Sequence, residues 1–160
     1  MEEEEGGSKG GREGKSKGIG GESDFELLML FRKRAGTVLT TGLTARSESY
    51  RLPSSSALAI LTRSTAETLP MELQVEQVRL IGGETVLTPA ESVQQLMTSS
   101  QTPIHIEFGP TALIETLRSR SDVRAFISSE YESGGAAFIS RWNLFKVGTF
   151  RFKNLYVTEV

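Results

Sequence analysis

The chain has no cysteine and only one histidine, His105, among its 160 residues. The absence of cysteine excludes disulfide frameworks, thiolate metal sites and cysteine nucleophiles. A single imidazole excludes the paired-histidine zinc motifs and leaves one candidate general base. Asp24 and Asp122 are the only aspartates, which argues against Mg²⁺ or Ca²⁺ sites built from several aspartates. The sequence therefore predicts neither a metal nor a cofactor.

Long apolar runs are also missing. No stretch of 18 apolar residues could form a transmembrane helix. No apolar signal-peptide core follows Met1, and four glutamates at residues 2–5 do not fit a transit peptide. We expect a soluble protein of the cytoplasm or nucleus, with no membrane partner.

Residues 1–24 differ in composition from the rest of the chain. They contain eight of the 16 glycines and a single large apolar residue, Ile19. Such a segment cannot bury enough surface to offset its ordering entropy, so we expect a disordered tail before a domain at residues 25–160. The tail has a net charge of −3 and the domain +1, so the overall charge of −2 averages two different parts.

Basic residues gather in the middle of the tail and near the start of the domain: Lys9, Arg12, Lys15, Lys17, Arg32, Lys33 and Arg34. Such charges favour weak contact with a nucleic-acid backbone, because binding releases counterions. A solubilising spacer is the alternative for the tail, since its tip is acidic. Gly14-Lys15-Ser16 does not form a phosphate-binding loop, because Lys9 stands where the first glycine is required.

Strand-like patterns dominate the domain. Strands are expected at residues 25–31, 37–41, 49–52, 57–62, 71–80, 103–108, 123–129, 136–142 (extended by 144–147) and 149–157. For residues 25–31 a short helix is the alternative, and Ser133-Gly134-Gly135 indicates a hairpin turn. Two helices are expected, one opened by the capping box Thr88-Pro89-Ala90-Glu91 and one by Gly109-Pro110-Thr111. This order, without alternation of strand and helix, predicts a mainly β fold: an antiparallel β-sandwich, an eight-stranded jelly roll with two short helices in connections.

Candidate chemical groups are few. His105 lies in the middle of an expected strand, and no GxSxG elbow accompanies it, so a surface or inter-subunit role is favoured over catalysis. The aromatic residues of the last strands, interleaved with lysine and arginine, fit a packed core better than a base-stacking platform. The chain ends in Val157-Thr158-Glu159-Val160, so Thr158 and Val160 match the pattern that a peptide-binding groove of the PDZ type accepts. No enzymatic activity is expected.

The helix opened by Thr88-Pro89-Ala90-Glu91 between two central strands, the second helix before the last three strands and the arm ahead of the first strand together resemble the single jelly-roll coat proteins of small icosahedral plant viruses. The resemblance covers residues 25–157 and implies a structural capsid protein of the virion. Such a protein self-assembles with copies of itself into a shell around nucleic acid, and single-stranded RNA is a candidate partner. The net negative arm departs from the basic arms of many members. The alternative is a non-enzymatic β-sandwich adaptor that binds a protein partner through an edge strand or its C-terminus.

Overall fold

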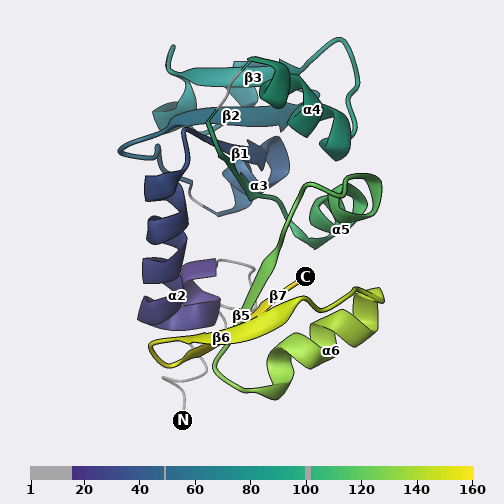
Figure 1. Cartoon of the computed structure of the whole chain (residues 1–160). Helices are drawn as coiled ribbons and strands as arrows, with labels where there is room; N and C mark the ends of the chain where they lie inside the picture. Colours follow the sequence, from purple (N-terminus) through teal and green to yellow (C-terminus); the bar gives the residue numbers. More distant parts are fainter. Residues whose placement is uncertain (1–15, 49, 100–101) are drawn as a thin grey trace. The chain divides into compact units, whose positions relative to one another are not determined.

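The computed structural model describes residues 16–48, 50–99 and 102–160. The chain divides into two compact units, whose helices and strands are labelled in Figure 1. The parallel-sheet unit comprises residues 30–120. The hairpin unit comprises residues 121–160 and the described residues before Leu30.

The parallel-sheet unit is built on a four-stranded sheet in which every neighbouring pair is parallel. Its strands lie in the order β3-β2-β1-β4. Their bounds are β1 (Thr37–Thr41), β2 (Ala57–Thr62), β3 (Val78–Gly82) and β4 (Ile104–Glu107). The connections hold the helices α3 (Gly42–Ser47) and α4 (Pro89–Ser99) and the 3₁₀ turns η1 (Ala66–Thr68) and η2 (Met71–Leu73), and α5 (Pro110–Ser119) follows β4.

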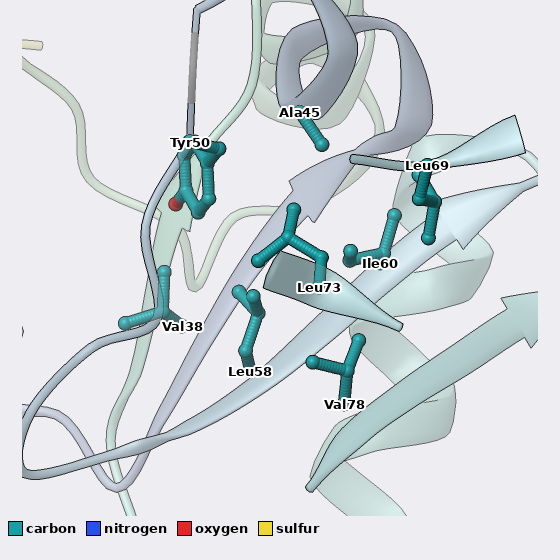
Figure 2. Packing of buried hydrophobic residues seen from close by; sticks show 8 residues of the cluster. All are labelled: Val38, Ala45, Tyr50, Leu58, Ile60, Leu69, Leu73 and Val78. Carbon is teal, nitrogen blue, oxygen red and sulfur yellow. The ribbon is translucent and has the colours of Figure 1, made fainter. Parts of the chain in front are cut away.

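Both faces of this sheet are covered. Successive strand residues point to opposite faces, and two separate apolar clusters result. Figure 2 shows the first, which α3 and the 3₁₀ segment cover: Val38, Ala45, Tyr50, Leu58, Ile60, Leu69, Leu73 and Val78. In the second, Val93 and Leu96 of α4 pack on residues of the strands, and its members are Leu39, Ala59, Ile81, Val93 and Leu96. Burial on both faces explains why β2 has a nearly continuous apolar run rather than an alternating pattern.

The start of α4 follows the predicted capping box. The Glu91 backbone N–H donates to the Thr88 hydroxyl at 3.1 Å, and the Thr88 backbone N–H donates to the Glu91 carboxylate at 2.8 Å. These reciprocal bonds satisfy amide groups that have no partner within the helix. The helix predicted from this motif is therefore confirmed.

The hairpin unit contains a three-stranded antiparallel sheet in the order β5-β7-β6. Its strands are β5 (Phe126–Ser129), β6 (Gly148–Phe152) and β7 (Leu155–Glu159), and α6 (Ser133–Trp142) lies between β5 and β6 in the chain. The first part of α2 (Ser16–Arg34) belongs to this unit. Its Glu26 accepts a hydrogen bond from Lys153 Nζ at 2.6 Å, and its Asp24 accepts one from the Ser128 hydroxyl.

The predicted antiparallel sandwich is wrong. The larger sheet is parallel, and the fold is α/β, because short helical segments rather than hairpins connect its strands. Residues 25–31 lie in α2, so the helical alternative holds there, and residues 16–24 of the predicted tail also lie in α2. Residues 49–52 form no strand where they are described, residues 71–80 contain η2 and only the beginning of β3, and residues 149–157 fold as the hairpin of β6 and β7.

The Ser133-Gly134-Gly135 sequence opens α6 instead of turning a hairpin. A β-carbon placed on Gly135 would lie 2.2 Å from the hydroxyl oxygen of Thr158 in β7, and one on Gly134 would lie 2.0 Å from that of Ser129 in β5. The glycines therefore allow the helix to approach the sheet closely. This is a packing requirement that sequence reasoning assigns to a turn.

Replacing Gly135 by alanine should lower the free energy of unfolding by about 1–3 kcal/mol, because the added methyl overpacks the contact with Thr158. Denaturant unfolding followed by circular dichroism measures this. Gly148→Ala is the matched control, since a β-carbon there meets no atom within 4 Å. Equal stability of the two variants would contradict the close packing of α6.

Candidate functional site

The strand order creates a point of reversal between β1 and β4. From β1 the chain places β2 and then β3 on one side, and β4 then pairs with the other side of β1. In open α/β sheets, ligands bind beyond the carboxyl ends of the strands at such a reversal. The register pairs Thr40 with Glu107, so the loops that follow β1 and β4 begin beside each other.

The loop after β1 is closed by its own side chains. Thr41 is the N-cap of α3, and its hydroxyl accepts a hydrogen bond from the Thr44 backbone N–H at 3.2 Å. The helix is only six residues long, and Gly42 is the one glycine of this loop. The glycine-rich fingerprint that holds a pyrophosphate after the first strand of a dinucleotide-binding fold is therefore missing here.

The loop after β4 is open. Gly109 is the N-cap of α5 and makes no side-chain hydrogen bond, Pro110 is the first helical residue, and the first turn contains no acidic side chain. At α4, by contrast, the Thr88 hydroxyl accepts from the Glu91 backbone N–H at 3.1 Å, and Glu115 accepts from the Ala90 backbone N–H at 3.2 Å. The backbone N–H groups and the dipole at the start of α5 are therefore available to an anion.

Neither the backbone conformation nor the packing at position 109 requires glycine. Its φ of −68° and ψ of 171° are accessible to any residue. A β-carbon at this position would meet no atom within 4 Å. The missing side chain instead leaves room for a ligand to approach the backbone at the start of α5.

The end of β2 supplies a positive charge at the same edge of the sheet. The buried Thr62 hydroxyl accepts a hydrogen bond from the Ser64 backbone N–H at 3.0 Å, which orders the turn after the strand. Between them stands Arg63, whose side chain is exposed. In dinucleotide-binding folds the position about 20 residues after the first strand contacts the adenosine ribose, and arginine nearby accommodates a 2′-phosphate there.

A buried polar cluster surrounds Glu107, the last residue of β4. Arg32 holds its carboxylate with two hydrogen bonds, from Nε at 2.7 Å and from Nη2 at 2.8 Å. The Tyr50 hydroxyl donates to Oε1 of the same carboxylate. His105 Nε2 lies 3.0 Å from Oε2 but is not aligned for a hydrogen bond. The Thr40 hydroxyl donates to the backbone carbonyl of Glu107 at 2.8 Å.

Burial by itself would raise the pKa of Glu107, but the hydrogen bonds and the positive charge of Arg32 outweigh it and lower the pKa to about 2. Burial, followed by the negative charge of Glu107, raises the pKa of the Tyr50 hydroxyl far above its ordinary value. Burial opposes protonation of Arg32, yet its bonds to Glu107 leave the pKa raised. The carboxylate is therefore ionised and its oxygens are engaged, so Glu107 is not suited to donating a proton.

Of the basic residues predicted to contact nucleic acid, Arg32, Lys33 and Arg34 lie together in the last turn of α2. Lys9, Arg12 and Lys15 lie outside the described residues, as does most of Gly14-Lys15-Ser16, and Lys17 lies within α2. Arg32 is committed to Glu107, with its side chain 11% exposed, whereas Lys33 and Arg34 are exposed in the last turn of α2. Their contact with nucleic acid stays a prediction.

The predicted C-terminal recognition residues belong to the small sheet. Thr158 is buried in β7, where it pairs with Ile127 and Thr149. Val160 is buried as well, and its backbone exchanges two hydrogen bonds with Ala125, at 2.9 and 3.0 Å. In this arrangement the backbone at Val160 already has a strand partner, and the binding role of this end stays a prediction.

His105, the single histidine, lies in the middle of β4. The His105 ring stacks on Phe31 with centroids 5.4 Å apart, and its side chain is 17% exposed. Its surface or inter-subunit role stays a prediction. Among residues 16–48, 50–99 and 102–160, no group of three or more side chains could hold a metal ion. None of the helices described there is long and apolar enough to cross a membrane.

Comparison with known proteins supports the α/β fold. No protein-family model matches the sequence, and no curated protein matches it either. Among solved structures, a pyrimidine reductase-like protein of Corynebacterium diphtheriae is similar, with a TM-score of 0.61 and 20% sequence identity. The match covers 91% of this chain and 83% of that protein. At this identity the likeness establishes a shared fold.

The resemblance to jelly-roll coat proteins is wrong, because the larger sheet is parallel and the similar structure is an α/β protein. The predicted roles as a capsid protein, a virion component and a shell around RNA depended on that resemblance and are wrong as well. That resemblance depended on reading nearly every apolar run as an antiparallel strand. The expectation of no enzymatic activity, which followed from the lack of a nucleophile–base pair in the sequence, conflicts with the name of the similar structure. The similar structure is named as reductase-like.

Proposed function

We propose that the chain is a reductase-like protein whose parallel-sheet unit binds a nicotinamide dinucleotide at the carboxyl edge of the sheet. The observation that carries this proposal is the open N-terminus of α5 at Gly109, placed directly after β4 at the reversal of strand order. A dinucleotide is favoured over a simple anion because the edge extends from this site past β1 to the basic turn after β2. The reductase-like name of the similar structure supports the same class of ligand.

The residues at this edge fit the phosphates of such a ligand. The first-turn N–H groups of α5 and the exposed Thr111 hydroxyl would bind the pyrophosphate. Arg63, with the Ser64 hydroxyl beside it, would bind a 2′-phosphate on the adenosine ribose. The chain therefore selects NADPH over NADH, and the bound nicotinamide supplies a hydride to the substrate.

The protein should bind NADPH at least about tenfold more tightly than NADH, because only NADPH carries the phosphate that pairs with Arg63. Replacing Arg63 by alanine should weaken NADPH binding by about tenfold and leave NADH binding nearly unchanged. Isothermal titration calorimetry of the full chain with each dinucleotide measures both affinities.

Arg79→Ala is the matched control, since it removes the same charge from the second residue of β3, near the amino end of that strand. It should leave both affinities unchanged. Failure of the unmodified protein to bind either dinucleotide would refute the proposed function. Equal binding of both would refute only the role of Arg63.

A further inference from the structure

Glu107 makes hydrogen bonds to three segments that lie 57 to 75 positions before it in the sequence. Arg32 comes from the last turn of α2, and it lies 75 positions before Glu107 in the chain. Tyr50 comes from the segment between α3 and β2, and Thr40 comes from β1. All three make hydrogen bonds to Glu107, the residue at which β4 ends.

Glu107 lies two residues before the N-cap of α5. Only Phe108 separates it from Gly109, the N-cap of α5. Its backbone carbonyl is fixed to β1 by Thr40, and its carboxylate is fixed to two further segments by Arg32 and Tyr50. The backbone that leads into the N-terminus of α5 is therefore fixed at Glu107 both through its carbonyl group and through its side chain.

Glu107 itself is not suited to contact the ligand through its carboxylate. One oxygen accepts from Arg32 Nη2 and Tyr50, and the other accepts from Arg32 Nε with His105 Nε2 beside it. The side chain is 10% exposed. A carboxylate with both oxygens hydrogen-bonded holds the groups around it in place. Because Arg32 neutralises its negative charge, Glu107 does not repel a nearby phosphate.

We propose that Glu107 is a positioning residue: held by Arg32 and Tyr50, it fixes the end of β4 so that the first-turn N–H groups of α5 converge on the dinucleotide phosphate. This inference rests on the proposed function and deepens it. Small displacements of a binding group weaken binding steeply, because hydrogen bonds to phosphate depend on distance and direction.

The test compares the unmodified protein with Glu107→Gln, Tyr50→Phe and Leu96→Ala. Leu96 is buried in the second apolar cluster on α4 and serves as a control for loss of stability alone. Calorimetric titration with NADPH should show binding weakened about tenfold in Glu107→Gln and about threefold in Tyr50→Phe. Leu96→Ala should bind within about twofold of the unmodified protein, although it is less stable.

A second readout does not depend on the dinucleotide. Amide hydrogen exchange, measured without ligand, should become faster at the first turn of α5 in Glu107→Gln but not in Leu96→Ala. Unchanged exchange there, or equal weakening of NADPH binding in Glu107→Gln and Leu96→Ala, would overturn the positioning role. If the unmodified protein binds no NADPH, the proposed function fails, whereas the exchange measurement still decides whether Glu107 orders the start of α5.

Discussion

Replacing Arg32 by methionine should lower the free energy of unfolding by about 3–5 kcal/mol, because it leaves the Glu107 carboxylate buried without its cation. The two side chains are 11% and 10% exposed, and two hydrogen bonds join them. Exposed ion pairs contribute about 1 kcal/mol or less. The loss is larger here because removing Arg32 leaves an uncompensated charge in a buried position. Urea denaturation of both proteins at neutral pH measures the loss.

The pH dependence of stability identifies the cause of that loss. The folded-state pKa of Glu107 is about 2, below its ordinary value of 4.5. A carboxylate with a lowered folded-state pKa contributes stability above the unfolded value, and this contribution of about 3 kcal/mol is lost as the pH falls from about 4.5 through about 2. In Arg32→Met the pKa is no longer held down, so this part of the pH dependence should flatten.

Lys33→Met is the matched control for Arg32→Met. It removes a positive charge from the neighbouring residue of the same helical turn, and the Lys33 side chain is exposed. Its unfolding free energy should stay within about 0.5 kcal/mol of the unmodified protein, as for most surface substitutions. A similar loss in both variants would attribute the effect of Arg32→Met to helix charge rather than to the pair with Glu107.

The strands and helices that can be predicted from the sequence are those marked by a pattern in neighbouring residues, such as an apolar run or a capping box. The β-favouring stretch at residues 37–41 and the apolar run at residues 57–62 coincide with β1 and β2, and the capping box predicts α4. The direction of the strands could not be found in the same way. The connection between β1 and β2 contains only the six-residue α3, which is too short to show a clear amphipathic period. Without a visible crossover helix, parallel strands look like antiparallel ones.

The candidate site shows the same division between local and distant information. Gly109 and Pro110 indicate the start of a helix, and the structure confirms α5 there. That this start lies at a ligand-binding edge follows only from the parallel pairing of β4 with β1. The pair of Arg32 with Glu107 joins positions 75 apart. From the sequence, Arg32 is predicted to belong to a basic surface, because it is followed by two further basic residues, Lys33 and Arg34, and nothing local distinguishes it from them.

Replacing Gly109 by aspartate should change stability and ligand binding in opposite directions. Aspartate is a favoured N-cap and its charge complements the helix dipole, so the free energy of unfolding should rise by about 0.5–1 kcal/mol. The added side chain meets no atom of the protein within 4 Å of its β-carbon. The same carboxylate would occupy the first-turn N–H groups and repel a phosphate, so NADPH binding should weaken at least about a hundredfold.

Gly109→Asn separates the charge from the size of the new side chain. Asparagine caps helices about as well as aspartate and has nearly the same shape, but it is neutral. It should weaken NADPH binding by no more than about tenfold, so the further loss in Gly109→Asp measures repulsion of the phosphate. If both variants bind NADPH as the unmodified protein does, the dinucleotide does not approach α5. A glycine that neither the backbone conformation nor the packing requires would then have no role in binding, and the site would have to lie elsewhere on the sheet edge.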